Sequence, residues 1–242
     1  MGTEHEAVQQ EPVPGEADGA LKESDGNPST MPPPMQAQPA PPVPQVFVVD
    51  DDLAIREWLE VMLKAAGHSV MSFASAPAFL EAYRQDQPGC LVLDIRMPEM
   101  SGLELQARLK ERAASLPVIF ITSHGDVPMA VEAMRSGAVD FLLKPFQDDD
   151  LLDRVRHALA LDAANQAERS ELAGIRERIA SLTPRELEVM RLVVQGRANK
   201  VIATDLNLSQ RTVEIHRARV MDKMAATSLA HLVRMVLDVD AE

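Results

Sequence analysis

From residue 46 to about residue 160, short apolar runs alternate five times with stretches of amphipathic helical pattern. The apolar runs are 46–49, 70–73, 91–93, 118–121 and 141–143, and the amphipathic stretches are 53–66, 76–85, 102–112, 127–136 and 148–161. Apolar strands that alternate with helices are typical of a parallel sheet covered on both faces. Because crossovers are right-handed, few strand orders remain, and we expect an α/β flavodoxin-like fold with a five-stranded parallel sheet.

The segments on either side of this pattern differ from it. Residues 1–45 are rich in Pro, Gly, Glu, Gln and Ala and hold too little apolar surface to offset the entropy of ordering, so we expect a disordered, proline-rich tail. Residues 161–181 contain no proline and a single glycine, Gly174. They are either a continuation of the preceding helix or a separate linker helix.

Residues 182–242 show the start and stop signals of four short helices. Thr183, Pro184 and Glu186 form a capping-box pattern for a helix that ends near Gly196. Asn199 is expected to cap a second helix that ends near residue 206, and Ser209 a third that ends near residue 224. A fourth helix is expected over 228–239. Four helices with short connections predict an all-α helix-turn-helix domain.

Charge and composition limit the classes of partner that the chain can bind. The net charge is −13, but residues 196–223 hold six bases and three acids, so nucleic-acid binding is expected only there. Cys90 is the single cysteine, which excludes a disulfide within the chain. We find no apolar run long enough to span a membrane and no signal-peptide pattern, and we therefore expect a soluble, cytoplasmic protein without a membrane partner.

Polar side chains follow the predicted strands at one edge of the sheet. Asp50 and Asp51 follow the first strand, Asp94 ends the third, Thr122 ends the fourth and Lys144 follows the fifth. Ligands of parallel sheets bind beyond this edge. Clustered carboxylates favour Mg²⁺, which suits phosphoryl transfer, and one carboxylate can then form an acyl phosphate. The neighbouring acid, residue 52, is better explained as the cap of the helix that follows it.

The segments VVDDD, LVLDIRMPEMSG, VIFITSHGD and DFLLKPF, in this order and spacing, resemble the receiver domains of response regulators over residues 46–160. The resemblance implies that Asp94 is the phosphoacceptor and that Phe141 is a switch aromatic. It also implies a cis peptide bond before Pro145 and, at Gly102, a backbone conformation closed to larger residues. It assigns Mg²⁺ to Asp50, Asp51, Asp94 and the backbone carbonyl of Arg96, and phosphoryl sensing to Thr122 and Lys144.

Two positions next to this set leave alternatives open. Arg96 lies two residues after Asp94, and His124 lies two residues after Thr122. Either these side chains set how readily water reaches the acyl phosphate, or they are exposed polar residues without such a role.

The C-terminal segment LTPRELEVMRLVVQGRANKVIATDLNLSQRTVEIHRARVMDKM resembles the LuxR-type helix-turn-helix, and the whole chain resembles the NarL/FixJ class of response regulators. The domain is expected over 182–242, after a linker helix over 161–181. By this resemblance Glu214 and Ile215 face base edges, with Arg217 nearby, whereas His216 either packs or contacts a phosphate. The contacts to the DNA backbone are assigned to Lys200, Arg211, Thr212 and Lys223.

The resemblance implies a transcription factor rather than an enzyme. By this resemblance we expect a sensor histidine kinase to phosphorylate Asp94, and phosphorylation to modulate homodimerisation and binding to promoter DNA, with RNA polymerase as a possible further partner. An alternative is a DNA-binding regulator that works without phosphorylation and whose receiver only mediates oligomerisation. A phosphatase or phosphotransferase could use the same acidic pocket, but it would not need the C-terminal domain.

Overall fold

The computed structural model describes residues 43–85, 87–123 and 127–240. Its sheet has five parallel strands in the order β2-β1-β3-β4-β5, which confirms the predicted flavodoxin-like fold. The predicted tail over 1–45 lies outside the described residues except for its last three, of which Gln45 begins β1. The strands are β1 Gln45–Val49, β2 Ser69–Phe73, β3 Gly89–Asp94, β4 Val118–Thr122 and β5 Asp140–Leu143.

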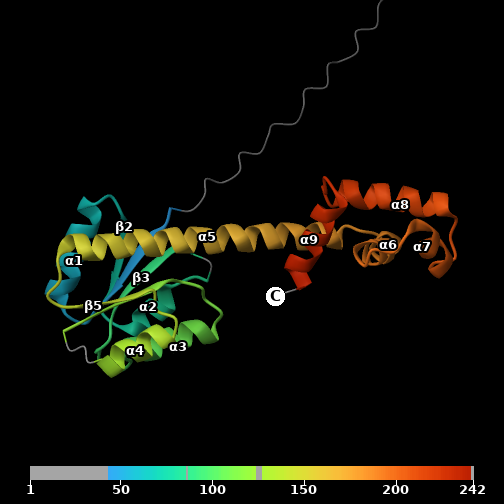
Figure 1. Ribbon diagram of the computed structural model, residues 1–242. Helices are drawn as coiled ribbons and strands as arrows, with labels where there is room; N and C mark the ends of the chain where they lie inside the picture. Colours follow the sequence, from blue (N-terminus) through green and yellow to red (C-terminus); the bar gives the residue numbers. More distant parts are fainter. Residues whose placement is uncertain (1–42, 86, 124–126, 241–242) are drawn as a thin grey trace, which may run out of the picture. The chain divides into compact units, whose positions relative to one another are not determined.

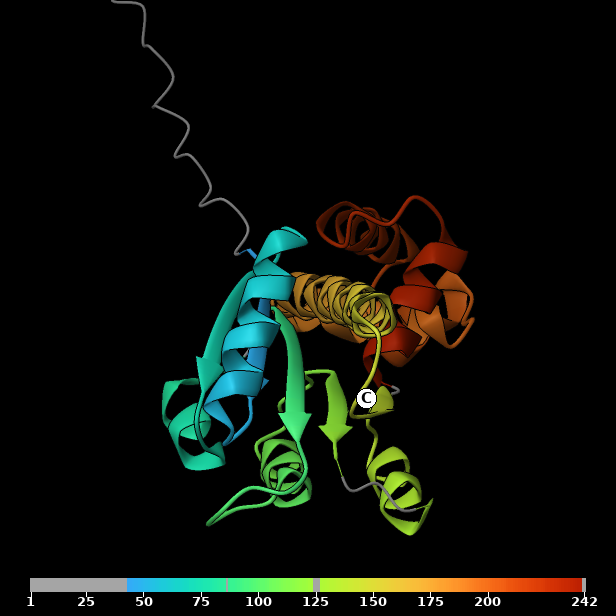
Figure 2. The ribbon, with the colours of Figure 1, turned by 90° about the vertical axis from the view of Figure 1, so that its left-hand side faces the viewer.

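Five helices cover the two faces of the sheet (Figures 1 and 2). They are α1 Leu53–Ala65, α2 Ala76–Ala82, α3 Gly102–Glu111, α4 Val127–Arg135 and α5 Asp148–Ala180. Because strand side chains alternate between faces, Val46 and Val48 point into a core under α1 and α5, whereas Phe47 and Val49 point into a core under α2, α3 and α4. Both cores are fully apolar at their centres, so the sheet is a rigid support for the residues at its edge.

Three local features of residues 46–160 were predicted from the sequence, and two of them agree with the structure. The Lys144–Pro145 bond is cis, and the side chain of Asp52 accepts hydrogen bonds from the N–H groups of Ala54 and Ile55, as predicted for a cap. The reason given for Gly102 was wrong, because its backbone is not in the left-handed region. A Cβ at this position would lie 2.3 Å from the carbonyl oxygen of Asp94, so lack of space excludes larger residues.

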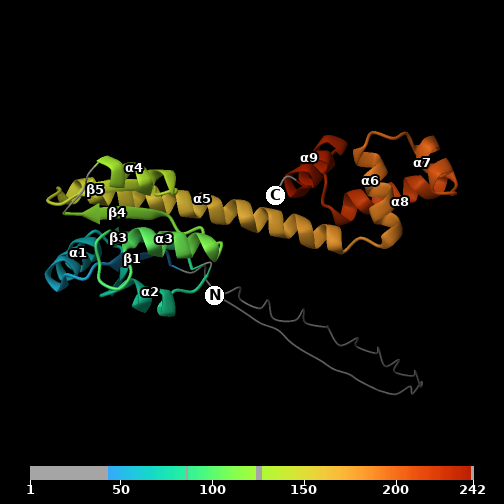
Figure 3. The ribbon, with the colours of Figure 1, turned by 90° about the horizontal axis from the view of Figure 1, so that it is seen from below.

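The helix α5 is continuous from Asp148 to Ala180, which favours the first of the two readings of residues 161–181 (Figure 3). Its first turns bury Leu151 and Val155 against the sheet. Further along, buried Asp162 accepts a 2.8 Å hydrogen bond from the backbone N–H of Gly89, at the start of β3, and a 2.7 Å bond from Gln166. The carboxylate of Asp162 therefore fixes the middle of α5 to the sheet.

Four helices follow, as predicted: α6 Pro184–Val194, α7 Asn199–Asp205, α8 Gln210–Lys223 and α9 Leu229–Asp240. The capping box of Thr183 with Glu186 and the cap by Ser209 are confirmed. The predicted cap by Asn199 is wrong: Ala198 occupies the N-cap position without a side-chain bond, and Asn199 is the first helical residue. The carbonyl oxygen of the Asn199 side chain instead accepts a 2.7 Å hydrogen bond from Arg217 of α8.

The apolar core of these helices includes the end of α5. Ile175 and Leu182 pack with Val189, Ile202 and Val220 in one buried cluster. The end of α5 and the residues just after it thus complete the core of the C-terminal helices. In the part of the chain that the structure describes, no helix has both the length and the apolar character needed to cross a membrane.

Candidate functional site

The polar residues predicted at the strand ends meet in one hollow at the carboxyl edge of the sheet. The ammonium group of Lys144 donates to Asp50 Oδ2 at 2.6 Å and to Asp94 Oδ1 at 2.9 Å. Both carboxylates are buried, and the backbone N–H of Arg96 donates to Asp94 Oδ2 at 2.7 Å. The hollow has a volume of about 280 Å³ and is also lined by Asp51 and Thr122.

Burial and neighbouring charge have opposite effects on the pKa values of Asp94 and Lys144. Burial raises the pKa of Asp94 above its ordinary value, although the hydrogen bond and the charge of Lys144 oppose the rise. Burial alone would lower the pKa of Lys144, but the hydrogen bonds to Asp50 and Asp94 outweigh it and hold that pKa above its ordinary value. Lys144 is therefore a firmly charged cation that compensates two buried carboxylates.

The remaining predicted residues of the receiver take different positions. Thr122 is buried at the end of β4, and Asp51 is exposed at the rim of the hollow. Phe141 is half-buried and packs against the core under α2, α3 and α4. The side chain of Arg96 is exposed, whereas His124 lies outside the described residues.

The donor set fits a magnesium ion by its chemistry. Mg²⁺ prefers oxygen ligands and keeps several waters, so it needs only one or two carboxylates. Asp50, Asp51 and Asp94 supply such oxygens around one hollow. Within the described ranges, however, no three acidic, His or Cys side chains are already arranged as a metal cage, and Lys144 bridges two of the carboxylates.

One residue of this site was not predicted. Arg56 lies on α1 and donates a 2.8 Å hydrogen bond from Nη1 to the backbone carbonyl of Asp50. It fixes the start of the loop that carries Asp50 and Asp51. Its position six residues after Asp50, on the first turn of the helix capped by Asp52, was the only sequence signal for this role.

The predicted DNA-contacting residues fall into two groups in the structure. Lys200, Arg211, Glu214 and Ile215 are exposed, and Ile215 exposes 45% of its surface. Exposed bases gathered on one helix are the charge pattern expected of a surface that contacts nucleic acid. Arg219, which was not predicted, is exposed on the same helix one turn after Ile215, so its position adds a further candidate contact.

Three of the other four residues of that prediction, Thr212, Arg217 and Lys223, form polar contacts within the C-terminal helices. Arg217 donates to Asn199, and the Thr212 hydroxyl lies 2.7 Å from the Ser209 hydroxyl. His216 is half-buried, with Nδ1 enclosed and unpartnered among the described residues. Lys223 donates to the buried Glu186 at 2.7 Å and to the carbonyl of Ser181 at 3.2 Å. The contacts of Arg217 and Lys223 join α8 to α7 and to α6, so these two bases support the packing of the helices.

The Lys223–Glu186 pair predicts an acid-sensitive C-terminal domain. The hydrogen bond from Lys223, followed by that from the N–H of Thr183, lowers the pKa of Glu186 from 4.5 to about 2. A lowered carboxyl pKa contributes stability above the unfolded value, and this contribution is lost as the pH falls from about 4.5 to 2.

We expect Glu186→Gln to lower the melting temperature of this domain at neutral pH and to flatten its decline with acid over that range. Thermal unfolding of both proteins as a function of pH tests this, with Glu188→Gln as the control, since Glu188 is an exposed acid of the same helix. Equal acid dependence of wild type and Glu186→Gln would contradict the role given to the pair.

Comparison with known proteins matches each half of the chain to a protein family. The family profile described as "Response regulator receiver domain" matches residues 46–156, and the one described as "Bacterial regulatory proteins, luxR family" matches residues 180–236. Transcriptional regulatory protein FixJ of Azorhizobium caulinodans is 49% identical over 192 residues, 79% of this chain and 91% of that protein. Response regulator protein TodT of Pseudomonas putida is 43% identical over 190 residues, 78% of this chain and 84% of that protein.

Solved structures agree with these relatives. The structure of the response regulator StyR has 46% sequence identity and a TM-score of 0.74, over 81% of this chain and 98% of that one. Full-length FixJ from B. japonicum has 42% identity and a TM-score of 0.51, over 84% and 100%. The chain therefore belongs to the two-component response regulators of the NarL/FixJ class, transcription factors that join a receiver domain to a LuxR-type helix-turn-helix domain.

Proposed function

We propose that Asp94 accepts a phosphoryl group from a phosphohistidine of the partner sensor kinase. The observation that carries this proposal is the contact of Asp94 with Lys144, in a hollow that Thr122 also lines. An oxygen of Asp94 attacks phosphorus, the phosphorus–nitrogen bond breaks, and the electron pair leaves with the imidazole. The product is an acyl phosphate on Asp94.

The neighbouring residues would hold the transferred group. Lys144 uses two of its three N–H donors on Asp50 and Asp94, so a third remains for a phosphoryl oxygen. Thr122, which lines the same hollow, would donate its hydroxyl to another oxygen. Asp50, Asp51, Asp94 and the carbonyl of Arg96 would hold Mg²⁺, which offsets the charge on the phosphoryl group.

We propose that the signal then passes through Thr122 and Phe141 to the surface formed by α4 and β5. That surface exposes three apolar side chains, those of Val131, Met134 and Leu143. Such a group supports either dimerisation or docking that phosphorylation can change. Promoter DNA and RNA polymerase are then the partners of the C-terminal domain. The kinase partner and the DNA target also place the protein in the cytoplasm under this proposal.

The phosphorylation step is tested by treating the full chain with acetyl phosphate and Mg²⁺ and measuring its intact mass. We expect one added phosphoryl group in the wild type and none in Asp94→Asn or with excess chelator. Asp149→Asn is the matched control, because Asp149 is an exposed acid outside the hollow. A phosphoryl group that remains in Asp94→Asn would contradict the assignment. If DNA binding and dimerisation were identical with and without phosphorylation, the alternative of a phosphorylation-independent regulator would hold.

DNA binding through α8 predicts a change in salt dependence. Arg211 is an exposed base at the start of this helix, where a phosphate contact is favoured. We expect Arg211→Met to weaken binding to specific and non-specific duplexes alike and to reduce the slope of log K against log salt by about 1. Fluorescence anisotropy over a salt series measures this, with Arg108→Met in the receiver as the control. An unchanged slope would remove Arg211 from the interface.

A further inference from the structure

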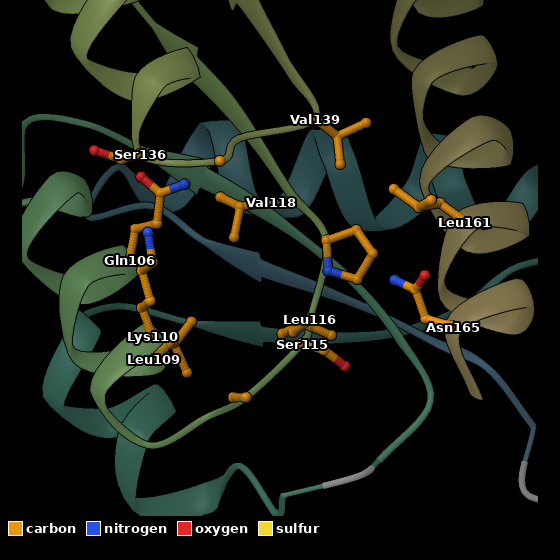
Figure 4. A pocket seen from close by; sticks show the side chains of 13 residues that line it. Gln106, Leu109, Lys110, Ser115, Leu116, Val118, Ser136, Val139, Leu161 and Asn165 are labelled. Carbon is orange, nitrogen blue, oxygen red and sulfur yellow. The ribbon is translucent and has the colours of Figure 1, made fainter. Parts of the chain in front are cut away.

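The receiver contains a second hollow (Figure 4). It lies at the start of β4, at the opposite end of this strand from the hollow that Asp94 lines. It has a volume of about 310 Å³ and lies between α3, the loop before β4, the segment after α4, and α5. Val118, at the start of β4, lines it, whereas Thr122, at the end of the same strand, lines the phosphoacceptor hollow. Four steps of about 3.3 Å separate these two residues, so the hollows are about 13 Å apart along the strand.

One polar side-chain atom at this hollow is buried without a partner among the described residues. Gln106 on α3 is 5% exposed, and its Oε1 accepts no hydrogen bond from the residues that the structure describes. A buried amide oxygen without a donor is unfavourable by comparison with the same oxygen in water, and such atoms are uncommon in native folds. The geometry therefore leaves a hydrogen-bonding group at this wall that a bound molecule can satisfy.

A cation lies one helical turn from this amide. Lys110 follows Gln106 by four residues on α3, and Figure 4 shows both side chains extending along the same wall of the hollow. No carboxylate within the described residues pairs with its ammonium group. Residues four apart on a helix are neighbours, about 5–6 Å between Cβ atoms, so one small molecule can reach both groups.

The rest of the hollow is largely apolar. Leu116, Pro117, Val139 and Leu161 line it. Leu161 lies across the hollow from Gln106, with Asn165 of α5 beside it (Figure 4). A ligand with an apolar group of modest size would cover these side chains, whereas an inorganic ion would leave them exposed to water. The combination of an amide, an ammonium group and an apolar wall defines the chemistry of the occupant.

We propose that this hollow binds a small apolar 2-hydroxycarboxylic acid. Its carboxylate pairs with Lys110, and its adjacent hydroxyl bonds Gln106. A hydroxyl can donate, so it can satisfy the side-chain oxygen of Gln106. The apolar group of the acid covers Leu116 and Pro117. The site lies away from Asp94, so acid and phosphoryl group can be bound together, and the proposal does not depend on phosphorylation.

The position of α5 gives binding a structural consequence. Leu161 and Asn165 belong to the part of α5 on either side of Asp162, whose carboxylate holds the helix against Gly89. An acid bound between α3 and α5 would add contacts at this anchor. Because a ligand that binds only the folded chain stabilises it by mass action, the receiver should melt at a higher temperature when the acid is present.

The test uses 3-phenyllactate as the probe and methyl NMR of the full chain. We expect concentration-dependent shifts of the methyl groups of Leu109, Leu116, Val118 and Val139, with a dissociation constant on the order of 1 mM for a ligand of this size. Methyl groups of Val189 and Val213 in the C-terminal domain should not move. Phenylpropanoate, which lacks the hydroxyl, should bind threefold to tenfold more weakly, roughly one hydrogen bond. The uncharged methyl ester should also bind more weakly.

Two substitutions connect each ligand group to its residue. In Gln106→Leu the advantage of phenyllactate over phenylpropanoate should disappear, and in Lys110→Met the advantage of the acid over its ester should disappear. Lys64→Met, an exposed lysine on α1, should leave all three affinities unchanged. Absence of shifts at the lining methyl groups with every compound would overturn the proposal. Equal affinities for the three compounds in the wild-type chain would do the same, even if Gln106→Leu failed to fold.

Discussion

Replacement of Gly89 by alanine is expected to remove most of the stability of the receiver domain. Gly89 begins β3 with φ +155°, and a Cβ there would lie 1.9 Å from the backbone carbonyl oxygen of Gln45 in β1. These two residues are register partners in the central pair of strands, so no flexible side chain can move aside. The backbone must shift, and the N–H of Gly89 would then lose its bond to the buried Asp162.

The expected size follows from three separate effects. Forced overlap in a packed interior, strain at this backbone conformation and loss of a hydrogen bond to a buried carboxylate each cost about 1–3 kcal/mol. We therefore expect a loss on the order of 4 kcal/mol or more, against a total of about 5–15 kcal/mol for a typical domain. Urea unfolding followed by the fluorescence of Trp58, the single tryptophan of the chain, reports the receiver selectively.

A second glycine separates steric overlap from backbone strain. Gly67, after α1, has φ +89°, but an added Cβ would meet nothing within 4 Å. Gly67→Ala should therefore cost only about 1–2 kcal/mol, the strain of the left-handed conformation. If Gly89→Ala lost no more stability than Gly67→Ala, the close approach of β1 and β3 and the anchor at Asp162 would not exist in solution as described.

Much of the candidate site around Asp94 could be predicted because it follows from strand order. Once apolar runs are recognised as parallel strands, the residue after each run must lie at one edge of the sheet. Asp94 and Lys144 are 50 positions apart in sequence, yet their side chains are in contact for this reason. The apolar pattern does not predict which of these side chains pair. The contacts of Lys144 with Asp50 and Asp94 depend on side-chain directions, which periodicity does not encode.

Other polar residues were harder to interpret because tertiary contacts determine their burial. Asp162 is an acid on a long helix, a position where charged side chains are usually exposed. In the structure it is buried, because its carboxylate accepts a hydrogen bond from the backbone N–H of Gly89. Gln106 is likewise buried by the packing of α3. The bases Arg217 and Lys223 were predicted from the family pattern to lie near DNA, yet each has a partner on another helix of the same domain. A one-dimensional charge pattern does not distinguish such contacts from free surface charges.

Replacement of Lys144 by methionine is the second change with a large expected effect. It removes the cation that compensates the buried carboxylates of Asp50 and Asp94. Removal of one partner from a buried ion pair costs about 3–5 kcal/mol, because the charge left behind is uncompensated. In the presence of a chelator, which removes Mg²⁺, Lys144→Met should therefore unfold at a much lower urea concentration than the wild type. Lys64→Met, the control, should change the free energy of unfolding by at most about 1 kcal/mol.

The pH dependence of this loss has a definite sign. The pKa of Asp94 is raised above its ordinary value of 3.8, so this group disfavours the folded state as the pH rises through its folded pKa. Without Lys144 that pKa should rise further, and mild acid should restore part of the stability of Lys144→Met. In the wild type, the raised pKa of Lys144 contributes stability below its ordinary value of 10.5, and this is lost only as the pH rises through the folded pKa.

Two further measurements decide whether electrostatics is the cause. Adding Asp94→Asn to Lys144→Met removes one of the opposing carboxylates, so the double variant should be more stable than Lys144→Met alone. Mg²⁺ should also stabilise Lys144→Met more than the wild type, since the carboxylates then lack any other cation. If neither the second substitution, nor acid, nor Mg²⁺ restored stability, the loss would come from packing around the side chain, and the charge cluster would not govern the receiver's energetics.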